Sequence, residues 1–140
     1  MNSGQSSHAP VILLIDDNED HILITQKIIE RAYPQSSVIV LMTGRAVKQH
    51  LATHVDHLPD LIFLDMDLPD ATGLDILREI HKYDDWLDVP VWLLSSWCDD
   101  AQLETAYELG IRGYFEKPLD RHGMDAIFHL FEYVNLEVTT

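Results

Sequence analysis

Five short apolar segments alternate with stretches of helical spacing, and this alternation restricts the fold more than any other feature of the sequence. The segments expected to form strands lie at 11–15, 37–42, 61–64, 90–95 and 113–118. Two of them, 11–15 and 61–64, are unbroken apolar runs, which is typical of strands buried on both faces of a parallel sheet. The pattern predicts an α/β fold with a doubly wound, five-stranded parallel sheet and helices on both faces.

Helix boundaries are marked between these strands. Asp17 or Asn18 is expected to cap a first helix that ends at Tyr33–Pro34, and Asp99 or Asp100 to cap a later one that Gly110 stops. Other helices are expected over 44–56, after the turn 70–73, and at the end through about Val134. The residues expected to face inward are Ile22, Ile24, Ile28 and Ile29, then Leu74, Leu77 and Ile80, then Leu103, Ala106, Tyr107 and Leu109.

The length of 140 residues suits one domain. We expect a disordered tail over 1–9, a domain over 10–135 and a carboxyl-terminal tail over 136–140, part of which forms an interface. The sequence has no apolar run long enough to span a membrane and no signal-peptide pattern. Cys98 is the only cysteine, so no internal disulfide can form, and a cytoplasmic location is expected.

Acidic residues dominate the charge. Asp and Glu total 24 against 9 Lys and Arg, which gives a formal net charge of -15. Such a chain repels nucleic-acid phosphates and anionic lipids, so neither nucleic acid nor a membrane is an expected partner.

Polar residues lie at the carboxyl ends of the expected strands, at the same point of each unit. They are Asp16 and Asp17, Asp65 with Asp67, Ser95 with Ser96, and Lys117. Parallel strands bring their carboxyl ends to one edge, where ligands bind in open α/β sheets. Carboxylates gathered there repel one another unless a cation relieves them, and a set of oxygen ligands favours Mg²⁺. Asp65 is then a candidate nucleophile that takes a phosphoryl group as an acyl phosphate.

These motifs resemble the receiver domains of two-component response regulators, including the stand-alone, chemotaxis-regulator-like form. The resemblance covers nearly all of residues 10–135. It rests on Ile15-Asp16-Asp17-Asn18-Glu19, Leu64-Asp65-Met66-Asp67-Leu68-Pro69 with Gly73, Leu94-Ser95-Ser96, and Gly110 through Tyr114 to Lys117-Pro118. It implies a flavodoxin-like sheet with the strand order 2-1-3-4-5, and a phosphoacceptor protein that catalyses at most its own phosphorylation and dephosphorylation.

The resemblance also implies a role for each site residue. Asp65 would accept a phosphoryl group from a sensor histidine kinase or a phosphotransfer protein. Asp17 and Asp65 would bind Mg²⁺ through carboxylates, Asp67 through its backbone carbonyl and Asp16 through water. Lys117 would hold the acceptor carboxylate and then the phosphate. Ser95 and Tyr114 would be the switch pair that remodels the face made by the fourth helix, fifth strand and fifth helix for a downstream protein.

Two residues depart from the usual pattern. An acid at Asp67 adds charge beside the metal ligands, and the bulky Trp97 is expected to shield or gate the phosphate. The apolar residues from Phe128 to Val138 suggest a homodimer through the carboxyl-terminal face, as in some receivers that serve bacterial phytochrome kinases.

Other interpretations remain open at this point. Leu64-Asp65-Met66-Asp67 also resembles the nucleophile and acid pair of haloacid dehalogenase-like phosphatases, although those enzymes carry the pair on their first strand. A receiver-like binding module that is not phosphorylated is a third possibility. His50, His54 and His57 share helical spacing but read as a solvated helix face, because no acid or cysteine completes a metal site there.

Overall fold

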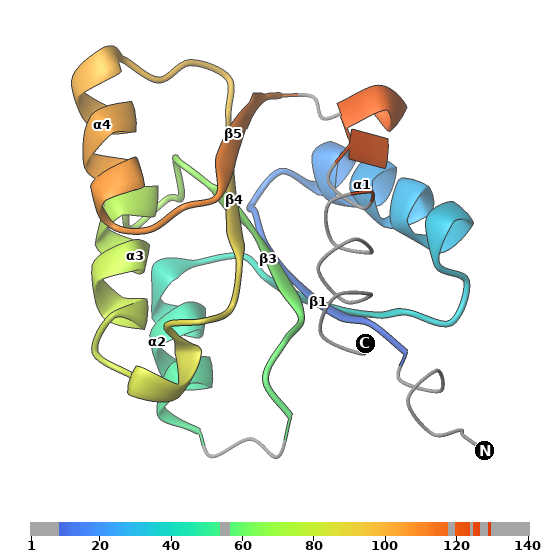
Figure 1. The fold of residues 1–140 in the computed structure, drawn as a ribbon, viewed down its shortest axis with the longest axis horizontal. Coiled ribbons are helices and arrows are strands. Elements are labelled where there is room, and N and C mark those ends of the chain that lie inside the picture. Colours follow the sequence, from blue (N-terminus) through green and yellow to red (C-terminus); the bar gives the residue numbers. More distant parts are fainter. Residues whose placement is uncertain (1–8, 54–56, 118–119, 124, 127–128, 130–140) are drawn as a thin grey trace.

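The computed structural model describes residues 9–53, 57–117, 120–123, 125–126 and 129. Its strands form one sheet in the order β2-β1-β3-β4-β5, and every neighbouring pair is parallel, which confirms the predicted fold (Figure 1). The strands are β1 (Val11–Ile15), β2 (Ser37–Leu41), β3 (Leu61–Asp65), β4 (Val91–Ser95) and β5 (Gly113–Glu116).

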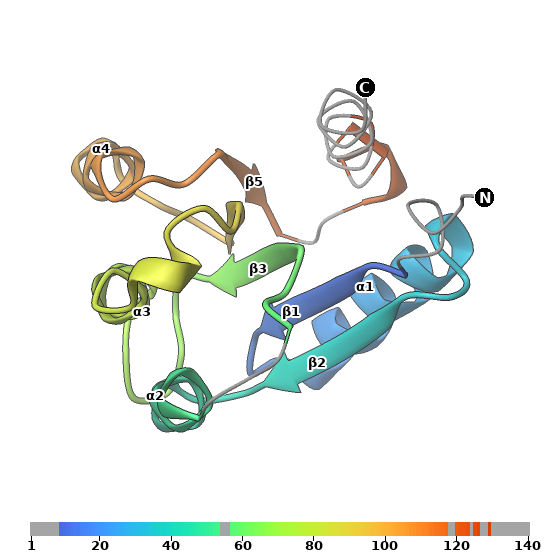
Figure 2. The ribbon, with the colours of Figure 1, turned by 60° about the horizontal axis from the view of Figure 1, so that its bottom comes forward.

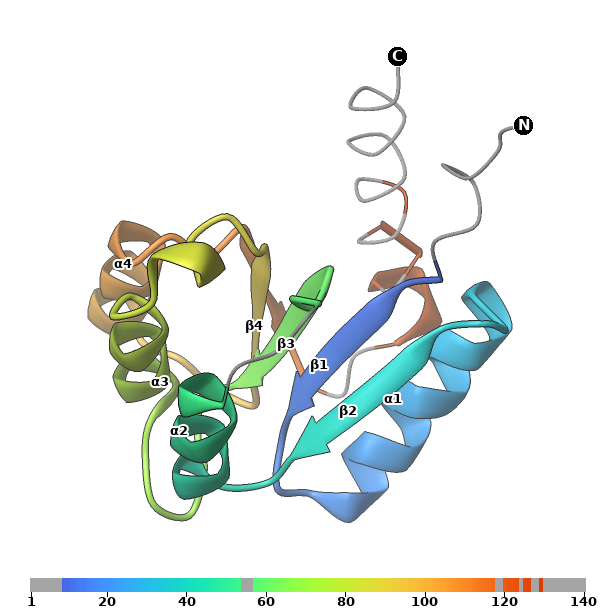
Figure 3. The ribbon, with the colours of Figure 1, turned by 90° about the horizontal axis from the view of Figure 1, so that it is seen from below.

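Helices cover both faces of the sheet. They are α1 (Glu19–Ala32), α2 (Gly44–Ala52), α3 (Gly73–Ile80), α4 (Asp100–Glu108) and a short 3-10 helix, η2 (Asp84–Trp86). Helix α1 lies on one face, and α2, α3 and α4 lie together on the other (Figures 2 and 3). Residues 121–123, 125–126 and 129 are helical, but most of the predicted final helix and both tails lie outside the described residues. Within the described ranges, no helix is long and apolar enough to cross a membrane.

The core has two parts, one on each side of the sheet. Side chains of β1, β3 and β4 pack on one side with Val47, Ile76 and Ala106 of α2, α3 and α4. On the other side they pack with Ile22 and Ile29 of α1. Strand β3 is buried along its whole length. The core packing around this strand therefore holds Asp65, the acid at its end, in place.

Two helix stripes differ from the prediction. Ile24 is 45% exposed and Tyr107 is 49% exposed, although both were expected to face inward. A helix turns by about 100° per residue, so Ile24 points away from the side on which Ile22 lies, and the inward position is taken by Thr25. Apolar identity alone did not show which side of these helices the sheet covers.

Helix caps decide between the alternatives left open by the sequence. The side chain of Asn18 accepts a hydrogen bond from the backbone N–H of His21, so Asn18, rather than Asp17, caps α1. Asp99 caps α4 and forms a reciprocal capping box with Gln102. After Gly110, the backbone N–H of Ile111 donates to the carbonyl of Ala106 and closes the end of α4 as predicted.

A bulky side chain lies across the start of β5. Trp92 of β4 is paired with Gly113, and a Cβ atom at Gly113 would collide with the indole ring of Trp92. The same ring packs against Phe115, with ring centroids 5.7 Å apart. Strand β5 therefore lies close to β4 only because residue 113 has no side chain.

Candidate functional site

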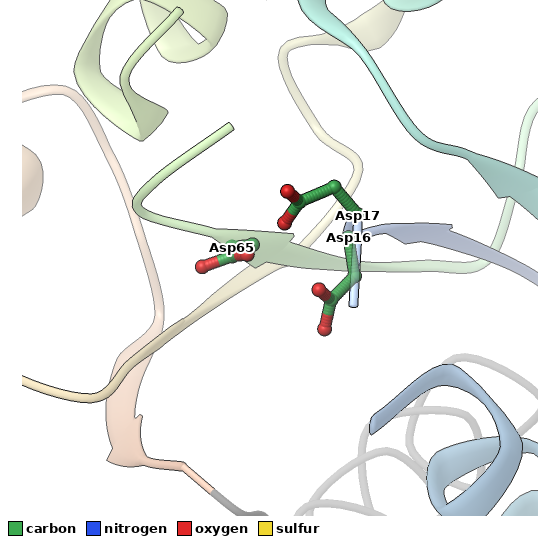
Figure 4. Close-up of side chains that lie close together, drawn as sticks. All are labelled: Asp16, Asp17 and Asp65. Atoms are coloured by element: carbon green, nitrogen blue, oxygen red, sulfur yellow. The ribbon is translucent and has the colours of Figure 1, made fainter. Parts of the chain in front are cut away.

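The carboxyl ends of β1 and β3 bring the predicted acids together. The two strands pair in parallel with Ile15 opposite Leu64, so Asp16 and Asp65 come next on neighbouring strands. Carboxylate oxygens of Asp16, Asp17 and Asp65 all lie within 4.8 Å of one another (Figure 4). Because Asn18 takes the role of helix cap, the side chain of Asp17 is left to this cluster.

Lys117 joins the cluster from the residue after β5. Its Nζ atom lies 3.0 Å from Oδ2 of Asp65 and 3.2 Å from Oδ1 of Asp16. The lysine side chain is 7% exposed, against 1% for Asp16 and 5% for Asp65. The backbone N–H of Lys117 donates to the carbonyl of Ser95, which fixes the lysine to the end of β4. One ammonium group therefore partly neutralises two buried carboxylates.

Backbone groups orient these carboxylates further. The N–H of Asp67 donates to Oδ1 of Asp65 over 3.1 Å, and the N–H of Asn18 donates to Oδ1 of Asp16 over 3.0 Å. Burial raises the pKa of Asp65 to about 6, while the hydrogen bonds from Lys117 and from the Asp67 N–H act in the opposite direction. Without a metal, the ionised form of Asp65 is therefore less favourable in the folded chain than in water.

The predicted switch residues lie on the neighbouring strands. Ser95 is fully buried, and its hydroxyl donates to the carbonyl of Trp97 over 2.6 Å and accepts from the N–H of the same residue. Tyr114 is half-buried beside the core on the α2–α4 side, and burial raises the pKa of its hydroxyl. Trp97 is 72% exposed, so its ring lies largely in solvent.

The loop between β3 and α3 makes one long-range contact that the sequence did not reveal. The carboxylate of Asp70 accepts hydrogen bonds from the backbone N–H groups of Gly44 and Arg45, at 2.6 and 3.0 Å. These bonds lower the pKa of Asp70. Asp70 was expected in a turn, and no local signal connects it to a helix start 26 residues away.

The family follows from the sequence match together with this geometry. Residues 12–129 match the family of response regulator receiver domains, and the chain belongs to that family. Its place is therefore in two-component signalling, in which receiver domains bind Mg²⁺ or Mn²⁺ at an acidic site and work with sensor kinases.

Two relatives support the assignment. A probable methanogenesis regulatory protein, FilR2 of Methanothrix harundinacea, is 30% identical over 112 residues, which cover 78% of this chain and 72% of the relative. Response regulator Rcp1 of Synechocystis is 28% identical over 119 residues, which cover 82% and 81%.

Solved structures of similar proteins share the fold. The bacteriophytochrome response regulator RtBRR has a TM-score of 0.73 at 27% identity, with 85% of this chain and 75% of that chain covered. The Mn²⁺-bound form of Rcp1 has a TM-score of 0.71 at 26% identity, with 90% and 89% covered. Family membership also counts against a haloacid dehalogenase-like phosphatase, since Asp65 ends the third strand rather than the first.

Proposed function

We propose that Asp65 accepts a phosphoryl group from a phosphohistidine of a sensor histidine kinase or a phosphotransfer protein. The observation that carries this proposal is the position of Asp65: a buried carboxylate at the end of the central strand, 3.0 Å from the Lys117 ammonium and grouped with Asp16 and Asp17. A carboxylate held beside a fixed cation at the open edge of a parallel sheet is suited to taking up a phosphoryl group.

In the transfer step, a carboxylate oxygen of Asp65 forms a bond to phosphorus while the phosphorus–nitrogen bond of the donor histidine breaks. The imidazole leaves with the electron pair of that bond and takes up a proton, and Asp65 becomes an acyl phosphate. Lys117 already contacts Asp65 and would hold a phosphoryl oxygen afterwards. Hydrolysis of the acyl phosphate resets the carboxylate, so the chain acts as a transient acceptor rather than as an enzyme on other substrates.

The donor set fits a hard divalent cation. Only oxygen atoms are offered by Asp16, Asp17 and Asp65, and they lie close enough together to share one ion. Asp17 and Asp65 would bind Mg²⁺ directly, Asp67 through its backbone carbonyl and Asp16 through water. When bound, the ion would neutralise the carboxylates and the incoming phosphoryl oxygens.

The output would run through Ser95 and Tyr114. To reach the phosphoryl group, the Ser95 hydroxyl must leave the Trp97 carbonyl, which frees the loop between β4 and α4. Tyr114 would then turn inward and change the face formed by α4, β5 and the following helix, where a downstream protein binds. The predicted homodimer contact over the carboxyl-terminal segment lies outside the described residues.

The kinase partner is proposed from the relatives. Rcp1 is a response regulator, and RtBRR is a bacteriophytochrome response regulator. A phytochrome-type sensor kinase is therefore the first donor to test for this chain. The exchange would take place in the cytoplasm.

The proposal is tested by labelling the purified chain with a phosphorylated kinase or acetyl phosphate in the presence of Mg²⁺. We expect one hydroxylamine-sensitive phosphoryl group by intact-mass spectrometry. Asp65→Asn should abolish the label. Asp67→Asn is the matched control, because it removes a neighbouring carboxylate and keeps the backbone carbonyl; it should still be labelled.

Two outcomes would replace the proposal. Full labelling of Asp65→Asn would show that another residue is the acceptor. Absence of both labelling and Mg²⁺ binding in the wild-type chain would indicate a receiver-like binding module.

A further inference from the structure

The two ends of the loop between β3 and α3, residues 66–72, are hydrogen-bonded to each other. The backbone N–H of Leu68 donates to the carbonyl of Ala71, and the N–H of Gly73 donates to the carbonyl of Met66. Asp67 and Thr72 form an isolated antiparallel bridge. The loop is therefore a narrow hairpin-like turn, and its tip carries Asp70.

A second element holds this tip. Asp70 spans the gap to α2 and accepts from two successive N–H groups at its start, those of Gly44 and Arg45. Helix α2 already has its own cap, because the hydroxyl of Thr43 accepts from the N–H of Ala46. Thr43 and Asp70 therefore accept from different N–H donors of the same helix end. Of these two residues, Asp70 is the one that connects the helix end to the loop.

The loop also approaches α2 very closely. A Cβ atom at the buried residue Gly44 would lie 2.8 Å from Cβ of Ala71 and 3.2 Å from Oδ1 of Asp70. A side chain there would push the loop away from the helix. Helix α2 is itself anchored, since Val47 and Leu51 are buried in the core. The start of α2 is thus a fixed support against which the loop rests.

This support lies next to the phosphorylation site. Asp67 stands between the buried Asp65 and the loop tip, and its N–H donates to Oδ1 of Asp65. A shift of the tip would reach the backbone of Asp67 through the hydrogen bonds of the short hairpin. The Asp67 side chain is exposed, so its backbone is held by the hairpin, by its bond to Asp65 and by the buried neighbours Met66 and Leu68.

We propose that Asp70 is a positioning residue for the phosphorylation site: by tying the β3–α3 loop to the start of α2, it holds the Asp67 backbone in the geometry that Asp65 and a bound cation require. This inference rests on the proposed function for its effect on Mg²⁺ and phosphate. The tie itself exists without either ligand.

Three variants separate positioning from helix capping. Asp70→Ala removes the tie. Gly44→Ala keeps the Asp70 carboxylate but forces the loop off the helix, and alanine is the better helix former. Thr43→Ala is the control, because it removes a cap of α2 without touching the loop. If Asp70 only caps α2, then Asp70→Ala and Thr43→Ala should behave alike, and only Gly44→Ala should disturb the loop.

The first readout needs no metal. Amide hydrogen exchange followed by NMR should show faster exchange at Asp67 and Leu68 in Asp70→Ala and Gly44→Ala, by about 10-fold or more for the opened loop. Thr43→Ala should leave these two amides unchanged while Ala46 exchanges faster. Asp70→Asn should restore much of the protection, because its side-chain oxygen still accepts one of the two bonds.

The second readout is Mg²⁺ affinity by calorimetry together with the lifetime of the acyl phosphate. We expect Asp70→Ala and Gly44→Ala to weaken Mg²⁺ binding by about 3- to 10-fold, less than the roughly 10- to 100-fold seen when a direct partner of a metal ligand is lost, because Asp70 acts through the loop. Thr43→Ala should stay within about 2-fold of the wild type, because the described hydrogen bond of Thr43 stays within its own helix end.

Unchanged exchange at Asp67 and Leu68 in Asp70→Ala would show that Asp70 does not hold the loop. Faster exchange there with wild-type Mg²⁺ affinity and acyl-phosphate lifetime would overturn the positioning role. Failure of the wild-type chain to bind Mg²⁺ or accept phosphate would instead overturn the proposed function, and the exchange data would still report on the tie.

Discussion

Two loops flank Asp65, and they are held by different means. The β3–α3 loop is bonded to its own ends and to α2 through Asp70. The β4–α4 loop has the Ser95–Trp97 pair at one end and the Asp99 cap at the other, with Trp97 mostly in solvent between them. The first arrangement preserves one geometry. The second is held at its Ser95 end by one hydroxyl, which would let go of Trp97 if it bonds the phosphoryl group as proposed.

The largest effect is expected when the Lys117 cation beside Asp65 is removed. Lys117→Met leaves Asp16 and Asp65 buried beside each other, and we expect a loss of roughly 3 kcal/mol in the free energy of unfolding at pH 7.5. Labelling should fall as well, because the acceptor loses its counter-charge. Urea unfolding measures the first effect and intact-mass spectrometry the second.

Two further measurements check this reason. The loss should be smaller at pH 5, where Asp65 is largely protonated and carries less charge to repel Asp16. Lys82→Met removes an exposed ion pair with Glu79 and serves as the control. An equal loss at both pH values would mean that packing, rather than charge, explains the effect of Lys117.

A smaller change of opposite sign is expected for Asp65→Asn. The pKa of Asp65 is raised from 3.8 to about 6 in the folded chain, so the folded state binds more protons between these values. The contribution of Asp65 to stability is therefore present at low pH and is lost as pH rises through about 6. Without metal at pH 7.5, Asp65→Asn should stabilise the chain by about 1 to 2 kcal/mol.

The acidic net charge also weakens folding as pH rises, so the difference between wild type and variant is the quantity to measure. Thermal unfolding from pH 4 to 8 should show this difference grow through pH 6. Asp88→Asn, which removes an exposed carboxylate, is the control for the change in net charge. Excess Mg²⁺ should shrink the difference or reverse it.

Ser95→Ala tests the second loop directly. It removes the hydroxyl that contacts both backbone groups of Trp97, and we expect a loss of about 1 kcal/mol with faster amide exchange at Trp97. Amides of the β3–α3 loop should not change. If both loops loosened together, they would form one unit, and the contrast between them would be lost.

The smallest effect is expected for Trp97→Ala. The side chain is 72% exposed, so stability should change by less than about 0.5 kcal/mol. Trp86→Ala, at a buried position, is the contrasting control and should cost several times more. The acyl-phosphate lifetime should also stay close to wild type; a much shorter lifetime would instead support the prediction that Trp97 shields the phosphate.

Local patterns were enough to predict the sheet and most of the site. Buried parallel strands are unbroken apolar runs, and parallel strands carry the residues after their ends to one edge, so Asp16, Asp17, Asp65 and Lys117 were expected to meet. The exposure of Ile24 and Tyr107 was not predicted, because it depends on which side of a helix the sheet covers. The tie from Asp70 joins residues that no periodic pattern relates, so only the structure reveals it.

Because the Trp92 ring lies over Gly113, a substitution at Gly113 would disturb the site without touching an acid. Gly113→Ala touches none of the acids, yet its methyl group would press on the ring and move β5 away from β4. Lys117 follows directly on β5, so its ammonium group would be withdrawn from Asp65. Such a variant would look like a signalling defect in an assay although its lesion is steric, and a smaller residue at position 92 should rescue it.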